Sequence, residues 1–231
     1  MAFFKKKQRP LEQDAADTVD EAAPAPRAPH LEHGPYDESA VPANDEQYVD
    51  LGGLRIPAVR GLELRMEVEQ ATGVVTAANL LLDGSSLQLQ AFAAPRSGGL
   101  WEAVRNTLRQ STVGQGGTAE AATGPFGDEL KLRLPVTRPD GKTGYRPARL
   151  LGVDGPRWFL RAVISGPACD DEQHAQALEN LISRVVVVRG RNAMPPEELI
   201  PLQLPGGGQP VAQLGGEDSP LERGRSISEI G

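Results

Sequence analysis

The residues best suited to bind a ligand lie in one short stretch, GVDGPRWFLRAVISGP at residues 152–167. Alternating residue types from position 157 onward predict a strand with two different faces. The first face is apolar and carries Trp158, Leu160, Ala162 and Ile164. The second face carries Arg157, Phe159, Arg161 and Val163. A guanidinium, a ring and a second guanidinium in this order suit an anion or a stacked base, so Arg157, Phe159 and Arg161 form the candidate binding face.

A structural role for the same two arginines is the alternative. On a solvated sheet face they would form cross-strand pairs with acidic residues of neighbouring strands, and such pairs contribute little individually. The acidic candidates are Glu63, Glu67 and Glu129. Residues 49–205 carry seventeen basic and seventeen acidic side chains, and this balance favours the pairing alternative.

Catalysis finds little support in the residue types. A nucleophile needs a base within hydrogen-bond reach, and His174 is the one histidine in residues 49–205. Cys169 lies five residues before it, but the carboxylates of SGPACDD raise the pKa of a thiol and keep it protonated. No Gly-x-Ser-x-Gly motif supports Ser165 as a nucleophile. We therefore expect no catalytic residues and no enzyme activity.

Metal and cofactor sites are not expected either. The cluster HLEH offers His30, Glu32 and His33, but the sequence shows no second ligand pair to complete a metal site. The glycine-rich GQGGT at 114–118 follows a helical pattern and lacks the Lys-Ser/Thr of a phosphate-binding loop. It is typical of a helix end.

The elements that must position these residues begin with three consecutive strands. Residues 61–70 alternate cleanly between apolar and charged side chains, which is typical of a half-buried antiparallel strand. Two further strands are expected at 74–82 and 86–93, and Asp83-Gly84 between them is a strong hairpin signal. The sequence therefore predicts a meander.

Two helices and further strands follow. A helix over 98–113 carries an apolar stripe and is expected to begin at a Ser97 cap. A second helix falls within 169–184, capped by Asp170 or Asp171. The further strands are predicted at 129–136, 145–153, 157–165 and 185–188. This order favours an α+β fold, a twisted and mostly antiparallel sheet with two helices packed on one face.

Composition divides the chain into three parts. Residues 1–48 form an acidic, Pro/Ala-rich leader with a short basic start, residues 49–205 a single domain, and residues 206–231 a Gly/Pro/acidic tail. The net charge of −7 lies in the two ends, which we expect to be disordered. The neutral middle does not attract nucleic acid. Residues 3–7 could touch an anionic bilayer weakly, but acids from Glu12 onward favour a solvated segment. The presence of one cysteine indicates a cytoplasmic protein.

Several segments together resemble a known family. They are LRIPAVRGLELRMEVEQ, LQLQAFAAPRSGGLWEAVR, GPFGDEL, PARLLGVDGPRWFLRAVISGPA and VVVVRGRNAMPPEELIPLQLP, spread over about residues 49–205. They are similar to an actinobacterial family of unknown function, domain number 3710. This resemblance implies an actinobacterial cytoplasmic protein and transfers no catalytic residue. The order of elements is also faintly similar to Mog1/PsbP-like domains, which implies a non-catalytic binding or assembly module.

The function that this sequence favours is a non-catalytic cytoplasmic binding or adaptor protein, whose partner is another protein rather than nucleic acid. The alternative is a module that binds a small anionic ligand or nucleic acid through Arg157, Phe159 and Arg161. No cofactor is expected with either function.

Overall fold

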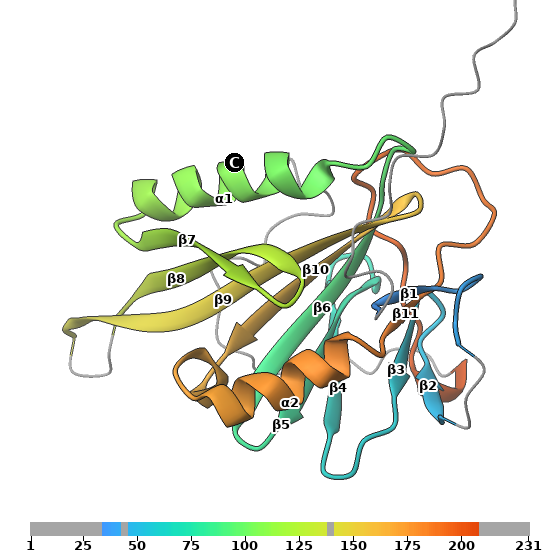
Figure 1. The fold of residues 1–231 in the computed structure, drawn as a ribbon, viewed down its shortest axis with the longest axis horizontal. Coiled ribbons are helices and arrows are strands. Elements are labelled where there is room, and N and C mark those ends of the chain that lie inside the picture. Colours follow the sequence, from blue (N-terminus) through green and yellow to red (C-terminus); the bar gives the residue numbers. More distant parts are fainter. Residues whose placement is uncertain (1–33, 43–45, 138–140, 208–231) are drawn as a thin grey trace, which may run out of the picture.

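The computed structural model describes residues 34–42, 46–137 and 141–207 (Figure 1). The segments 1–33 and 208–231, which carry most of the predicted disorder and the predicted bilayer contact, lie outside the described residues. The α+β class is confirmed, with two α-helices and mostly antiparallel sheets among the described residues.

A small four-stranded sheet begins earlier in the chain than predicted. Its strands are β1 (Tyr36–Asp37), β2 (Tyr48–Asp50), β3 (Leu54–Pro57) and β11 (Val186–Val187), in the order β1-β11-β3-β2. Since β1 pairs in parallel with β11, part of the predicted leader belongs to the fold. The indole Nε1 of Trp158 donates to Asp37 Oδ2 at 2.9 Å and fixes this segment to the core. The predicted boundary at residue 49 is therefore too late.

The main sheet is antiparallel throughout, with seven strands in the order β4-β5-β6-β10-β9-β8-β7. Its strands are β4 (Glu63–Val68), β5 (Val75–Leu82), β6 (Ser85–Ala93), β7 (Thr118–Gly124), β8 (Gly127–Thr137), β9 (Thr143–Gly155) and β10 (Trp158–Ser165). The predicted meander is confirmed as β4, β5 and β6. Asp83 and Gly84 both have positive φ, as a tight hairpin turn between β5 and β6 requires.

Helix α1 (Leu100–Gly114) confirms the first predicted helix, but not its cap. Gly99 is the N-cap residue and supplies no side chain, so Ser97 does not fill this role. Asp154 at the end of β9 accepts from the Leu100 and Trp101 N–H groups at 3.1–3.3 Å instead. A carboxylate distant in the sequence thus satisfies the free amides of the first helical turn.

Helix α2 (Glu172–Ile182) follows the 3-10 turn η2 (Pro167–Cys169). Asp171 is its N-cap residue and accepts from the His174 N–H at 2.9 Å, which confirms one of the two predicted caps. A further 3-10 turn, η3 (Pro205–Gly207), ends the described chain.

The two helices pack on opposite faces of the main sheet, so the prediction of one shared face is wrong (Figure 1). Successive residues of a strand point to opposite faces, and those of β10 separate accordingly. Leu160 belongs to the cluster that contains Leu181 of α2, whereas Phe159 stacks on Trp101 of α1 with ring centroids 6.0 Å apart. Both sheet faces are therefore covered where the helices lie.

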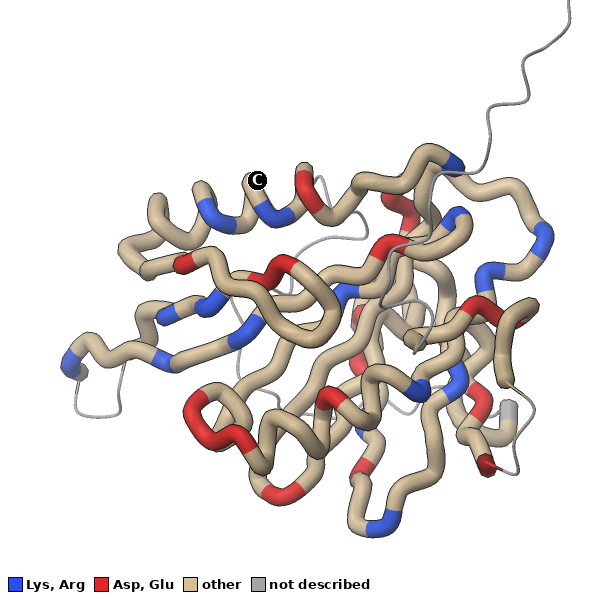
Figure 2. The backbone as a smooth tube through the Cα atoms, viewed as in Figure 1, with Lys and Arg blue, Asp and Glu red and all other residues tan. Residues whose placement is uncertain are grey.

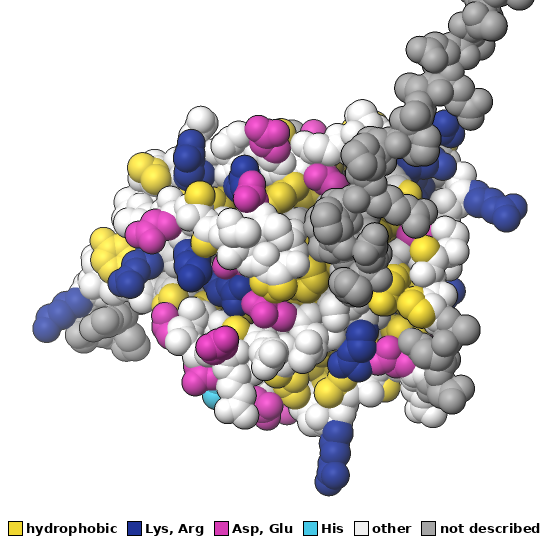
Figure 3. Space-filling view, in the orientation of Figure 1, with side chains coloured by type: hydrophobic (Ala, Val, Ile, Leu, Met, Phe, Trp, Pro, Cys, Tyr) yellow, Lys and Arg dark blue, Asp and Glu magenta, His cyan; other side chains and the backbone are white. Residues whose placement is uncertain are grey.

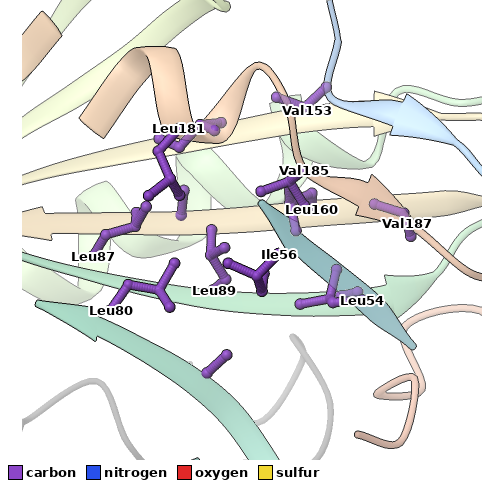
Figure 4. Close-up of a cluster of buried hydrophobic side chains, with 14 of the residues drawn as sticks. Leu54, Ile56, Leu80, Leu87, Leu89, Val153, Leu160, Leu181, Val185 and Val187 are labelled. Carbon is purple, nitrogen blue, oxygen red and sulfur yellow. The ribbon is translucent and has the colours of Figure 1, made fainter. Parts of the chain in front are cut away.

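The larger core lies between the main sheet, α2 and the small sheet (Figure 4). In Figure 4, Leu87, Leu89 and Leu160 point from the main sheet toward Leu181 of α2 and Ile56 of β3. Fully burying such a side chain contributes roughly 1.5–3 kcal/mol. This core fixes β10 firmly, and with it the residues predicted to bind.

Candidate functional site

The apolar face of β10 is core, as predicted. Its four side chains are almost completely buried in the cluster on the α2 side. They are Trp158, Leu160, Ala162 and Ile164. The alternation in the sequence was therefore interpreted correctly for this face.

The other face of β10 is not a solvent-exposed surface, so the predicted arrangement of the candidate binding residues is wrong. Phe159 has no exposed surface, because it packs between Trp101 and Phe92 on the α1 side. Arg157 lies outside the strand, in the β9–β10 turn, where it is exposed with a φ of 65°. Arg161 is 3% exposed. The three side chains do not form one exposed group.

Arg161 is a buried cation without a carboxylate in hydrogen-bond contact. One of its terminal nitrogens donates to Gln90 Oε1, and its guanidinium lies 5.8 Å from the centroid of the Phe92 ring. Its Nε has no hydrogen-bond partner among the described residues. Burial lowers the pKa of Arg161 to about 10, with the charge of Glu67 acting in the opposite direction.

Gln90 and Arg161 continue into a line of polar side chains across β10, β6, β5 and β4, which we call the polar row. Its members are Arg161, Gln90, Gln88, Asn79 and Glu67. Glu67 accepts from Gln88 at 2.8 Å and from Asn79 at 3.3 Å, while the Gln90 amide donates to the Thr76 carbonyl at 3.2 Å. Gln88 and Asn79 thus donate to Glu67, whereas Gln90 accepts from Arg161.

The predicted cross-strand ion pairs are not formed by the predicted arginines. Glu67 affects Arg161 through its charge without a salt bridge. Glu63 pairs with Arg65 at 3.1 Å, and Glu129 pairs with Arg149. Neither the exposed binding face nor the pairing alternative therefore describes Arg157 and Arg161.

Arg149 forms a buried ionic cluster that sequence reasoning missed. Its Nε and one Nη donate to the two carboxylate oxygens of Glu129 at 3.1 and 2.8 Å, and the same Nη also donates to Glu179 at 2.7 Å. These two carboxylates raise the pKa of Arg149 against the opposing effect of burial. Since Glu179 belongs to α2, the cluster joins this helix to β8 and β9. The sequence carried no clear signal for it, because Glu129 alternates with leucines as a residue on the solvated side of a strand would.

The residues weighed for catalysis do not form an activated nucleophile. Burial, followed by the charge of Asp170, raises the pKa of the Cys169 thiol. The His174 ring instead contacts Asp171 Oδ1 at 2.7 Å at the exposed start of α2. The hydrogen bonds from His174 lower the pKa of Asp171, so this contact belongs to the helix cap.

A basic surface lies on the hairpin of β8 and β9, which extends past the ends of both helices (Figure 1). We call it the hairpin surface and define it by Lys131, Arg133 and Tyr145. Alternation and strand register place all three side chains on one side of the hairpin, and Tyr145 is 55% exposed. None of the three forms an ion pair or side-chain hydrogen bond with another described residue. Lys and Arg positions follow this hairpin in Figure 2, and their side chains gather over it in Figure 3.

Two other features bear on the site. No group of three His, Cys, Asp or Glu side chains among the described residues could hold a metal ion. No helix in the described part of the chain is long and apolar enough to cross a membrane. His30, Glu32 and His33 lie outside the described residues.

Comparisons with known proteins agree with the resemblance found in the sequence. No curated protein matches the chain. Among solved structures it is similar to cyanobacterial PsbP (CyanoP) from Synechocystis, with 12% identity, 64% of this chain and 95% of that chain covered, and a TM-score of 0.36. That similarity is weak. The family model described as a protein of unknown function (DUF3710) matches residues 34–210, which includes the early strand β1. The chain therefore belongs to the DUF3710 family.

Proposed function

We propose that this protein is a non-catalytic binding protein that contacts another protein through the hairpin surface. The observation that carries this proposal is the exposed Tyr145 on the same side of a projecting hairpin as two basic side chains. Tyrosine and arginine are the side chains that most often dominate the energy of protein interfaces. Here they are available, because no described residue pairs with them.

The positive charge of the hairpin surface indicates that its partner is acidic. Lys131 and Arg133 would pair with carboxylates, and Tyr145, which follows Arg133 toward the end of the hairpin, would fill an apolar depression beside them. We therefore propose a partner with an acidic surface next to a small apolar pocket. Glu120 lies opposite Lys131 in the register of β7 with β8, and this acidic residue limits the surface on that side.

The test compares full-length variants in affinity capture from a native lysate treated with nuclease. One variant carries Arg133→Glu with Tyr145→Ala, and the control carries Arg109→Glu on the exposed side of α1. We expect the wild type and the control to retain the same proteins in quantitative mass spectrometry. The hairpin variant should lose at least one of them by tenfold or more, since hot-spot losses reach about 2 kcal/mol or more.

Two results would count against the hairpin surface. If all variants retain the same proteins in equal amounts, the partner uses another surface. If the hairpin variant loses its secondary structure by circular dichroism, a second variant, Lys131→Gln with Tyr145→Ser, repeats the comparison with smaller changes. Retention of all partners by that folded variant would reject the proposal.

A second candidate function is the binding of an oxyanion at Arg161, as an amended form of the anion-binding alternative. The free Nε of this buried guanidinium favours it. Since Phe159 is buried, no ring beside Arg161 is open to stack a base, and a carboxylate or phosphate group is the fitting ligand. Thermal unfolding with inorganic phosphate or acetate tests it. Ligand should raise the melting temperature of the wild type and not of Arg161→Met, and equal shifts would reject it.

We retain a cytoplasmic location and an actinobacterial source as proposals. A single cysteine excludes an intrachain disulfide, and fifteen of the seventeen basic residues in 49–205 are arginine, as GC-rich coding favours. Fractionation of source cells tests the location, because recovery in the membrane or secreted fraction would contradict it.

A further inference from the structure

The two outer strands of the main sheet, β4 and β7, differ in how well their edges are protected. An edge strand exposes unpaired backbone N–H and C=O groups, which can pair with a strand from another chain. Proteins block such edges with charged side chains, prolines or bulges. The main sheet has two such edges, one at β4 and one at β7.

The β4 edge is blocked in two ways. Glu63, Arg65 and Glu67 place a charge at every second position of this strand. The register with β5 also shifts between Glu67 and Val68, which is a bulge or irregularity near the end of β4. Both features disfavour addition of another strand.

The β7 edge has neither protection. Its sequence TAEAATG contains no proline and one charged residue, Glu120, and its register with β8 continues without a shift over the whole strand. Thr118, Ala121 and Thr123 are exposed. The hydrogen bonds of β7 within the described part of the chain are those of its ladder with β8, so its outer backbone groups have no described partner.

We infer that β7 pairs in antiparallel fashion with β7 of a second copy of this chain, centred on Ala121. The strand runs from Thr118 to Gly124, so a two-fold axis at Ala121 pairs its whole length. A two-fold axis perpendicular to the sheet keeps the α1 faces of both copies on one side, as a continuous antiparallel sheet requires. The pairing joins the two main sheets into one.

The side chains and charges fit this register. Thr118 lies opposite the partner's Gly124, Ala119 opposite the partner's Thr123, and Glu120 opposite the partner's Ala122. Apart from Glu120, which faces an alanine, these opposed side chains are small, and no two like charges face each other directly. A register centred on Glu120 would instead oppose two carboxylates. The single charge of β7 therefore disfavours that register and permits the pairing centred on Ala121 with a second copy.

The expected dimer is reversible. A ladder of seven residues is small beside the area that stable interfaces bury, so the association should depend on concentration. This inference does not depend on the proposed function, because it uses the β7 edge and not Tyr145 or Arg133.

Sedimentation velocity of the full-length chain over a range of concentrations tests the inference. The wild type should move from monomer to dimer as concentration rises. Ala121→Lys opposes two like charges at the two-fold axis and should weaken the dimer at least tenfold. Val74→Lys adds the same charge near the opposite edge, at a residue 38% exposed, and should leave the dimer unchanged.

A charge-swapped mixture completes the test. Ala121→Lys mixed with Ala121→Glu should restore the dimer, because the two opposed side chains then attract each other. Recovery of this kind would not follow if the lysine merely damaged the fold. The inference would be overturned if the wild type stays monomeric at every concentration. It would also be overturned if Ala121→Lys and Ala121→Glu each leave the dimer intact.

Discussion

Arg149 and Arg161 are both buried guanidinium groups, and they lie on opposite faces of the same sheet. Arg149, on the α2 face, is held by Glu129 and Glu179, and these carboxylates raise its pKa. Arg161, on the α1 face, has an amide and an aromatic ring as partners, and burial lowers its pKa to about 10. Removing one member of a buried ion pair destabilises a fold strongly, whereas a buried cation without a carboxylate in contact is itself unfavourable to folding.

The two buried arginines therefore differ in what they contribute on the α2 face and on the α1 face of the main sheet. The Arg149 cluster connects α2 to the sheet, and each of its three charged groups has an ion-pair partner. Arg161 retains an unsatisfied Nε within the polar row. A buried polar atom without a partner disfavours folding, so Arg161 does not stabilise the fold in the way that Arg149 does.

The largest effect is expected from Arg149→Met. The substitution leaves Glu129 and Glu179 without their cation, and Glu129 is almost completely buried. Breaking a buried pair in this way costs about 3–5 kcal/mol. Urea unfolding followed by circular dichroism should therefore show a strongly reduced free energy of unfolding. A change below 1 kcal/mol would mean that the cluster does not hold α2 on the sheet.

The two carboxylates of this cluster should differ from each other. The Glu129 side chain is 3% exposed and binds Arg149 through both oxygens, whereas that of Glu179 is 19% exposed and binds through one. Glu129→Gln should cost about 2 kcal/mol and Glu179→Gln about 1 kcal/mol. The same urea experiment measures both. Equal losses would show that burial does not separate the two contacts.

A smaller effect concerns Cys169, which lies between β10 and α2. Because burial raises the pKa of its thiol, the folded chain binds the proton more tightly than the unfolded chain does. Stability should therefore fall slightly as pH rises above the ordinary thiol value of 9. Cys169→Ala should reduce this fall in urea unfolding between pH 8 and pH 10. The same slope in both proteins would contradict the prediction.

Sequence reasoning predicted those parts of the fold in which residue types alternate strongly. The meander, the Asp83-Gly84 turn and the apolar face of β10 follow from local patterns. Strand β7 was missed because it has no large apolar side chain and its alternation ends after four residues. The α1 cap was misassigned because Asp154, its true partner, is distant in the sequence.

The candidate site was predicted less well, for a physical reason. The second face of β10 was expected in solvent because both helices were placed on the first face. With α1 on that second face, Phe159 becomes core, and Arg161 on the same face is buried beside Phe92. Alternation in a strand shows which residues share a face, but not which element covers that face. The burial of Arg149 was missed because alternation does not show that α2 covers this position of β9.

Urea unfolding of Arg161→Met beside Arg149→Met, in the same buffer at neutral pH, tests the central comparison most directly. We predict that Arg161→Met changes the free energy of unfolding by no more than about 1 kcal/mol, since the lost contact with Gln90 is offset by removal of a buried charge. Arg149→Met should lose several times as much. Equal losses in the two variants would contradict the account, because Arg161 would then hold the fold as Arg149 does.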